Sequence, residues 1–407
     1  MSIEIGTLPT GGLRALRQVV ASAFGDEMSD AEMRDLEQIL EIDRVVCATE
    51  GSTIVGGAGA FSYGLTIPGG EARAAGVTAV GVAPSHRRQG ILRRMMRYQL
   101  DDVHQRGEPL AILWASEGGI YQRYGYGLAT VSASVDVERS RNAFRQPSAP
   151  EGRIRMVPRE EADLLFPPVY EKMREANPGF FTRSPEWWAT EVLNDPEYRR
   201  YGRGPCVYAV WDLDGAPGGY VLYRVQQEWD ARGSNSTLHV HELMATTPAA
   251  TRELWRFVFD VDLMVRTRAR LLAPDHPLLL LMAEPRRLGL SVGDGLWLRI
   301  VDVAGALGAR SYAADDSLVL GVADEFCPWN AGRWYLAASG GSGSAERTDR
   351  EPDLVLDVSD LAAVYLGAFT FARLHKAGRG VEHRPGAGDR ADAMFRVDRA
   401  PWCPQIF

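Results

Sequence analysis

Residues 80 to 92 of this chain read VGVAPSHRRQGIL, from Val80 to Leu92. The alternation of Val80 with Val82 predicts a strand, and Pro84 predicts where that strand ends. From Leu92 onward, apolar residues recur at the three- and four-residue spacing of an amphipathic helix. The sequence therefore predicts a strand, a basic turn and the start of a helix in direct succession.

The basic turn between this strand and this helix is suited to an anionic ligand. The first turn of a helix presents N–H groups without intrahelical partners, together with the positive end of the helix dipole. Gly90 lets a ligand approach the backbone, and Arg87 and Arg88 add positive charge. These features favour a cofactor that carries a diphosphate; the alternative is a surface turn with two solvated arginines.

The pattern V-x-V-x-P-x-x-R-R-x-G resembles the acetyl-CoA signature of the GNAT N-acetyltransferases. It matches neither the Walker A loop nor the dinucleotide motif G-x-G-x-x-G, and Leu92 stands where the GNAT signature usually has a small residue. The resemblance implies acetyl-CoA as co-substrate. The positions it assigns to the cofactor are Val80, Gly81, Val82, Arg87, Arg88, Gln89, Gly90, Ile91, Leu92, Arg93, Ser116 and Glu117.

A second segment agrees with this assignment. Leu110 to Ala115 is an apolar run of strand length, and the residues after it place Tyr121 four positions before Gly125-Tyr126. This resembles the GNAT element Y-x-x-x-G-[FY]. In that family the two strands splay apart around the pantetheine chain, and the tyrosine protonates the leaving thiolate, a role that falls here on Tyr121.

The whole chain is similar to the enhanced intracellular survival (Eis) family of aminoglycoside acetyltransferases, in its length, its motifs and its last residues, which run from Ala393 to Phe407. This resemblance implies an α/β (α+β) architecture of tandem GNAT folds with mixed sheets flanked by helices, then a sterol-carrier-like α+β domain. We expect the three domains at residues 1–145, 146–296 and 297–407. The resemblance also implies a homo-hexamer, assembled as a trimer of dimers.

Composition narrows the class of protein. The chain has 407 residues, of which 45% are hydrophobic, so two or three globular domains are expected. The formal charge of −8 argues against a nucleic-acid partner and favours cationic ones. Four scattered cysteines without a C-x-x-C pair predict no zinc site and no disulfide framework, and no segment resembles a signal peptide or a membrane span. We therefore expect a cytoplasmic protein without a metal or a membrane partner.

The second predicted domain repeats the order of elements without the cofactor chemistry. Its strand-to-helix turn, residues 245–252, lacks both the paired basic residues and the glycine. We therefore expect this copy to supply cleft walls and packing while the first copy binds the cofactor. His239 and His241 flank Val240 as a possible metal pair, but no third ligand stands at a recognisable spacing.

Two further expectations concern secondary structure. Residues 129–137 alternate and are expected to form the strand that closes the first domain. Residues 359–376 are expected to form one amphipathic helix capped by Ser359, and its apolar residues are explained more simply as core than as a lipid site.

Acetyl transfer by direct attack needs an oxyanion donor, an acid and a base. We assign the oxyanion donor to the backbone N–H of Val82, the acid to Tyr121, and the base or proton relay to the α-carboxylate of Phe407; the alternative for Phe407 is a tail that only covers apolar surface. Prolines and apolar residues near Phe407 could hold that end rigidly, and the Eis resemblance assigns the same role to it. The resemblance also implies that Phe24 and Asp26 line the substrate pocket; the alternative is a loop turn with a solvated aspartate.

The expected acceptor is a cationic small-molecule amine such as an aminoglycoside. Two alternatives remain open from the sequence. One is an acetyltransferase that acts on protein lysines, and the other is a non-catalytic acyl-CoA or lipid-binding protein.

Overall fold

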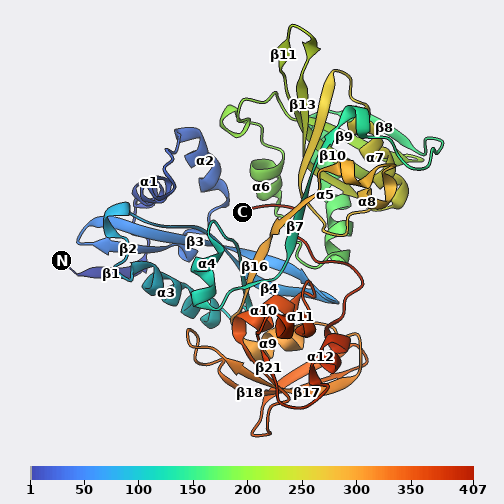
Figure 1. Ribbon diagram of the computed structural model, residues 1–407. Coiled ribbons are helices and arrows are strands. Elements are labelled where there is room, and N and C mark those ends of the chain that lie inside the picture. Colours follow the sequence, from blue (N-terminus) through green and yellow to red (C-terminus); the bar gives the residue numbers. More distant parts are fainter. Residues whose placement is uncertain (1) are drawn as a thin grey trace. The chain divides into compact units, whose positions relative to one another are not determined.

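The computed structural model describes residues 2–407, which form two units (Figure 1). The first unit contains the residues up to Thr130, then Gly295–Pro401 and Ile406–Phe407. The second unit contains Val131–Asp294 and Trp402–Gln405. Each unit is built around a seven-stranded sheet.

The sheet of the first unit has the strand order β1-β2-β3-β4-β5-β16-β6. Its strands are β1 Ile3–Thr7, β2 Val46–Glu50, β3 Thr53–Ile67, β4 Gly70–Val82, β5 Leu110–Trp114, β6 Gly127–Leu128 and β16 Leu296–Ile300. The long strands β3 and β4 pair antiparallel over most of their length.

Strand β4 leaves its neighbour β5 just before the sequence motif that begins at Val80. The parallel pairing of β4 with β5 covers only Ala74–Gly76 against Leu110–Ile112. Beyond it, the register between β3 and β4 shifts, and Ala79 takes a left-handed conformation with φ of 52°. A bulge of this kind bends and twists a strand. It opens the edge of β4 near the basic turn of residues 84–90.

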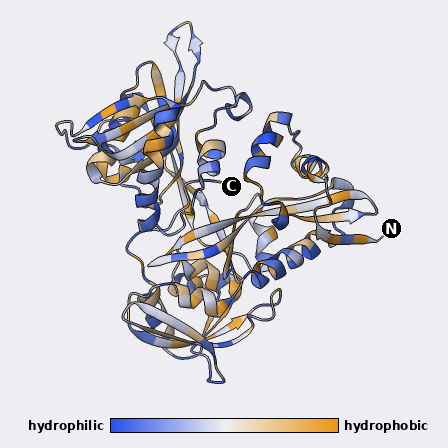
Figure 2. Ribbon diagram, turned by 180° about the vertical axis from the view of Figure 1, so that it is seen from behind, coloured by the Kyte–Doolittle hydropathy of each residue, from blue (hydrophilic) through white to orange (hydrophobic). Residues whose placement is uncertain are grey.

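Four helices accompany this sheet, namely α1 Leu13–Phe24, α2 Asp30–Ile39, α3 Ile91–Gln105 and α4 Gly118–Tyr121. Helix α3 buries Met96, Leu100 and Val103 against the sheet, in a core with Ala75 and Val77. Its polar residues lie between these apolar positions, so hydrophilic and hydrophobic colours alternate along the helices in Figure 2. The spacing that predicted the helix is thus the spacing of its buried face.

The C-terminal part of the first unit is a small α+β region. Its five-stranded sheet has the order β19-β18-β17-β20-β21. The strands are β17 Asp316–Ala323, β18 Gly332–Ser339, β19 Ser342–Arg347, β20 Leu354–Asp357 and β21 Val381–Glu382, and the helices are α9 Val303–Ala309, α10 Val358–Tyr365, α11 Phe371–Lys376 and α12 Ala387–Phe395.

The expectation of one continuous helix over residues 359–376 is wrong. Helix α10 ends at Tyr365 and α11 begins at Phe371. Between them Gly367 takes φ of 95°, which a right-handed helix cannot accommodate. The cap of α10 is Asp357, whose side chain accepts from the N–H of Ser359.

The second unit has a sheet of order β15-β7-β14-β13-β10-β9-β8. Its strands are β7 Val131–Glu138, β8 Arg153–Val157, β9 Val207–Leu213, β10 Ala216–Gln226, β13 Ser236–Ala245, β14 Met264–Leu272 and β15 Ser291–Asp294, with a separate hairpin of β11 Trp229–Asp230 and β12 Gly233–Ser234. The helices are α5 Arg159–Ala176, α6 Pro185–Trp187, α7 Pro248–Asp260 and α8 Leu278–Leu281.

The strand expected to close the first domain belongs to the second. Residues Val131–Glu138 form β7, which pairs with β14 and β15. The place beside β5 is taken by β16, Leu296–Ile300, which is far away in the sequence. The alternation of residues 131–138 correctly predicts a half-buried strand, but any sheet with an open edge can accept such a strand. The architecture is otherwise the predicted one of mixed sheets flanked by helices with a final α+β region.

Candidate active site

A cavity of about 950 Å³ lies in the first unit where β4 and β5 diverge. It is large enough for a sizeable ligand, since typical ligand pockets measure about 300–1,000 Å³. The predicted cofactor residues that line it are Val80, Gly81, Val82, Arg87, Arg88, Gly90, Ile91, Leu92, Arg93, Ser116 and Glu117. Of the predicted set only Gln89, an exposed residue, does not line it.

The turn before α3 is shaped as an anion cradle. Gly90 precedes the helix with φ of 77°, and Arg88 also takes a positive φ, of 63°. A Cβ on Gly90 would meet no protein atom within 4 Å, so the backbone there faces open space. No side chain caps the helix. Its first N–H groups are therefore available to a ligand.

The two arginines of the turn have different surroundings. The guanidinium of Arg87 donates to the carbonyl of Ala23 at 2.8 Å, which ties the turn to the end of α1. Within residues 2–407 the side chain of Arg88 makes no hydrogen bond or ion pair, although it lines the cavity. Of these two arginines, Arg88 is thus the one whose guanidinium can bind a diphosphate without giving up an existing hydrogen bond.

The backbone N–H of Val82 points toward the gap between β4 and β5. The N–H of the next residue, Ala83, donates to the carbonyl of Val55 on the β3 side at 2.8 Å. Successive N–H groups of a strand point to opposite edges. The N–H of Val82 therefore faces away from β3, where the pairing with β5 has already ended.

Tyr121 lies at the end of α4 and lines the same cavity. It is 6% exposed, and burial raises its pKa to about 12. The phenol is therefore protonated at neutral pH and able to donate. Its ring packs edge-on against Tyr126, with ring centroids 5.9 Å apart.

Tyr124 is a second tyrosine of the cavity wall that the sequence motif does not single out. Burial raises its pKa as well, and its ring packs against Phe326 at 5.0 Å. The third tyrosine of the motif, Tyr126, is fully buried and does not line the cavity. The structure thus leaves two candidates for the acid.

The two predicted acceptor residues differ in position. Phe24 is 58% exposed and lines the cavity together with Ala23. Asp26 does not line it, and its carboxylate accepts from the N–H of Glu27 at 2.8 Å. The cavity also has wall residues that sequence reasoning missed, namely Ala23, His86, Ile120, Arg123 and Tyr124. His86, Ile120, Arg123 and Tyr124 are close in sequence to motif residues but occupy its unspecified positions or flank it, whereas Ala23 is brought to the wall by the fold.

Phe407 packs on the strand pair β3 and β4, at the place where β4 separates from β5. Its ring meets that of Tyr63 edge-on, with centroids 5.2 Å apart. A Cβ on Gly76 would lie 3.2 Å from the Phe407 ring and 2.2 Å from the Tyr63 ring, so only glycine leaves room for both. Gly76 is also the last residue of β4 that pairs with β5. Phe407 itself does not line the cavity.

The residues just before Phe407 are held inside the second unit. Trp402 packs edge-on against Phe180 at 4.9 Å, and its N–H donates to the carbonyl of Pro178. The indole of Trp187 donates to the side-chain oxygen of Gln405 at 3.0 Å. Residues 402–405 are therefore ordered by specific contacts, as the stiff sequence predicted.

The corresponding turn of the second unit is closed to an anion. The side chain of Thr247 caps α7 by accepting from the N–H of Ala250 at 3.1 Å. This internal cap uses an N–H that an open helix start would offer to a ligand.

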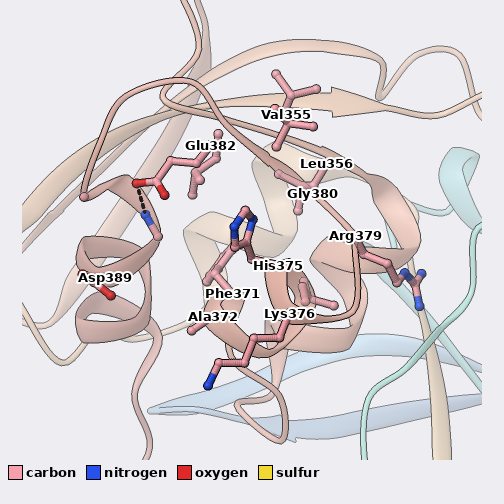
Figure 3. A pocket seen from close by; sticks show the side chains of 15 residues that line it. Val355, Leu356, Phe371, Ala372, His375, Lys376, Arg379, Gly380, Glu382 and Asp389 are labelled. Atoms are coloured by element: carbon pink, nitrogen blue, oxygen red, sulfur yellow. Dashed lines mark hydrogen bonds between the residues drawn. The ribbon is translucent and has the colours of Figure 1, made fainter.

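A smaller cavity of about 200 Å³ lies in the C-terminal region, between α11, α12 and β20 (Figure 3). Figure 3 shows His375 in its centre, while Lys376 and Arg379 point away from each other. Its volume is below the range of typical ligand pockets.

Leu361 and Val364 of α10 are fully buried, as expected of core residues.

Among residues 2–407, no group of three or more histidine, cysteine or acidic side chains could hold a metal ion. All four cysteines are unbridged. In the described part of the chain no helix is both long and apolar enough to cross a membrane.

Family comparisons agree with this geometry. Residues 4–129 match a family described as acetyltransferase (GNAT) domain, and residues 179–300 match a second family of the same description. Residues 303–404 match the sterol carrier protein domain.

Individual relatives extend over the full chain. An uncharacterized N-acetyltransferase of Streptomyces avermitilis is 42% identical, with 98% of this chain and 100% of that protein covered. The N-acetyltransferase Eis of Mycobacterium tuberculosis is 35% identical, with 93% of both chains covered. The crystal structure of Eis1 from Mycobacterium abscessus is 33% identical, covers both chains completely and has a TM-score of 0.84.

Proposed function

This chain belongs to the Eis family of GNAT N-acetyltransferases, and we propose that it transfers acetyl groups from acetyl-CoA to the amines of a polycationic small molecule such as an aminoglycoside. The observation that carries the proposal is the cavity of about 950 Å³ in the first unit. It combines the open start of α3, the backbone edge of β4 and the phenol of Tyr121.

The residues present fit acetyl-CoA. The uncapped N-terminus of α3, the bare backbone at Gly90 and the unpaired side chain of Arg88 suit the diphosphate. The gap between β4 and β5 suits an extended pantetheine arm, because its strand edges offer N–H and C=O groups. Bound acetyl-CoA would supply the activated acetyl group.

In the proposed reaction the amine attacks the thioester directly. A C–N bond forms, the C–S bond breaks, and the CoA thiolate leaves. The N–H of Val82 stabilises the negative charge that develops on the thioester oxygen. Tyr121 donates its proton to the thiolate.

The attacking amine must first lose a proton, and we assign this step to the α-carboxylate of Phe407. An α-carboxyl group has a pKa of about 3.5, so it is ionised at neutral pH and attracts a cationic amine. The docking of the Phe407 ring at Gly76 supports this assignment, because it fixes the residue beside the divergence of β4 and β5. Phe24 and Asp26 are proposed to contact the acceptor.

The proposal extends to the setting of the enzyme. From the family resemblance we infer a homo-hexamer built as a trimer of dimers, working in the cytoplasm, with a role in resistance to aminoglycoside antibiotics. The net charge of −8 suits a cationic acceptor.

A thiol-release screen tests the proposal. Purified protein with acetyl-CoA is offered aminoglycosides, polyamines and lysine peptides at equal concentration, and products are identified by mass spectrometry. We expect acetylated aminoglycoside, with one thiol released for each acetyl group transferred. Preferred turnover of lysine peptides would instead indicate a protein acetyltransferase. Acetyl-CoA binding without thiol release for any amine would indicate a non-catalytic acyl-CoA-binding protein.

A further inference from the structure

The two histidines that sequence reasoning weighed as a metal pair lie in a group of arginines. Arg224 on β10 is the cross-strand neighbour of His239 on β13, and His239 is the neighbour of Arg268 on β14. Adjacent strands lie about 4.8 Å apart, so the three side chains form one row on one face of the sheet. Asp136 on β7 ends the row as the neighbour of Arg268.

Three more cationic or titratable side chains surround this row. His241 is the unpaired residue of a bulge in β13 and interacts electrostatically with Arg224 and His239, and Arg270 follows Arg268 on the same face of β14. Arg203, from the loop before β9, interacts electrostatically with Arg224, Arg268 and Arg270.

Acidic partners compensate only part of this charge. Asp195 pairs with Arg224 and with Arg200, and Asp136 pairs with Arg266 and Arg268. Within residues 2–407, Arg203 and Arg270 have no carboxylate partner. The Nε of Arg203 is moreover buried without any hydrogen-bond partner. A buried donor left in this way costs free energy, and an anion would satisfy it.

Burial and the nearby arginines both lower the pKa values of the two histidines. Burial, followed by Arg203 and Arg268, lowers the pKa of His239 to about 4, while Asp136 opposes the shift. The pKa of His241 is also lowered to about 4, first by burial and then by Arg224, Arg203 and His239, with Asp195 opposing. Both rings are therefore neutral at neutral pH, and they add hydrogen-bonding groups to a face whose charge comes from arginine. Such surroundings disfavour a metal cation.

The same face of the first unit has a different character. There, Ala75 and Val77 of β4 pack toward α3, so Ala74 and Gly76 face the opposite side, where Phe407 docks. In the second unit, Leu238 and Val240 of β13 pack with residues of α7, so His239 faces the corresponding side. The corresponding face of the second unit thus carries Arg224 and His239 on neighbouring strands, while Tyr220 and Leu222 further along β10 belong to a buried apolar cluster.

We propose that this face of the second unit, formed by Arg203, Arg224, His239, His241, Arg268 and Arg270, is a binding site for a diphosphate-type oxyanion. Guanidinium groups bind phosphate oxygens in a bidentate manner. The row of side chains spans three strands, which is wide for one phosphate and suitable for two linked ones. The site is independent of the proposed acetyl transfer, which uses the first unit.

Pyrophosphate is the probe, and the histidines are the local reporters. The full-length protein, labelled at histidine Cε1, is titrated with pyrophosphate by NMR. Both reporters lie in the second unit, so pyrophosphate bound in the first unit is not what they report. The His239 and His241 signals are assigned with the variants His239→Gln and His241→Gln. We expect both signals to shift saturably and both pKa values to rise, because a bound anion offsets the arginines. Sodium chloride at equal ionic strength is expected to have no such effect.

Variants separate this site from general ionic effects. Arg203→Gln with Arg270→Gln should raise the pyrophosphate Kd at least about tenfold, since both charges lack partners. The single variant Arg270→Gln changes an exposed residue, so a loss of affinity in this variant is not explained by misfolding. Arg232→Gln, at an exposed position of the β11–β12 hairpin, is the matched control and should leave Kd unchanged. Arg88→Ala in the first unit should also leave the histidine shifts intact.

Absence of any pyrophosphate shift at His239 and His241 would overturn the proposal. So would equal shifts with chloride, or binding that survives in both the double variant and Arg270→Gln. Histidine shifts with RNA or an acidic protein but not with pyrophosphate would also reject it.

Discussion

The rings of Tyr63 and Phe407 pack edge to face, with centroids 5.2 Å apart and ring planes inclined by 70°. The contact joins a strand of the central sheet to a residue more than 300 positions later in the chain, and it depends on the missing side chain of Gly76. It places Phe407 against β4, the strand that ends at Val82 just before the basic turn.

Deletion of Phe407, or extension beyond it by a tag, should abolish turnover while the thermal unfolding midpoint stays close to that of the parent. The reason is that either change removes or displaces the α-carboxylate that we propose as base. An N-terminal tag is the control and should be harmless. A C-terminally extended protein with full kcat would exclude the carboxylate from the mechanism.

Tyr121→Phe should lower kcat by about 10²–10⁴-fold, the usual contribution of a general acid, and leave acetyl-CoA affinity nearly unchanged. Because burial raises the pKa of Tyr121 to about 12, deprotonation of this group should not limit the rate at any pH near neutrality. Tyr124→Phe is the matched control, since it lines the same cavity. If Tyr124→Phe is the inactive variant, the roles of the two tyrosines must be exchanged.

Arg88→Ala should weaken acetyl-CoA binding by about 1–3 kcal/mol in calorimetry, because a charge-assisted hydrogen bond to the diphosphate is lost. Gly90→Val should weaken it further, since Gly90 has φ of 77° and its Cβ would project into the open cradle. Arg94→Ala serves as the control: this arginine of α3 donates to the carbonyl of Ile3 and does not line the cavity. Unchanged affinity in both test variants would remove the diphosphate assignment.

Gln405→Leu should reduce kcat several-fold without affecting acetyl-CoA affinity. The substitution removes the acceptor of the Trp187 indole, a bond at 3.0 Å that orders the chain two residues before Phe407. Such a bond contributes about 1 kcal/mol, enough to loosen a terminal segment without unfolding the protein. Gln227→Leu, an exposed position in the same unit, provides the comparison. Equal kcat in the two variants would show that this anchor does not position the terminus.

The free energy of unfolding should fall as pH drops from about 6.5 toward 4, partly because of His276. Burial lowers the pKa of its imidazole from 6.5 to about 4, and the N–H groups of Leu278 and Trp255 point at its two ring nitrogens. Between these pH values the unfolded chain binds the proton and the folded chain does not, so protonation favours unfolding.

Denaturant titrations across this pH range measure the effect. His276→Phe should make the pH dependence shallower, because the non-titrating ring removes one of the groups that must be protonated. His383→Phe, at an exposed position, should leave the slope as it is. An unchanged slope in His276→Phe would contradict the burial argument.

The sequence alone determined the local chemistry of this protein. Alternation of valines, a proline, and the spacing of Met96, Leu100 and Val103 predicted β4, the turn and α3, because strand and helix periodicity depend only on neighbouring residues. The family of the chain was also recognisable from the motif around Gly90 and from the residues that follow β5.

Tertiary structure alone decided which strands close which sheet. β7 carries a pattern that fits either sheet, and the competition between β7 and β16 for the edge beside β5 is settled by long-range packing that no local pattern encodes. Likewise, the sequence presented His239 and His241 as an isolated pair. Only the pairing of β13 with β10 and β14 placed arginines on both sides of them, since the neighbours across a sheet lie far apart along the chain.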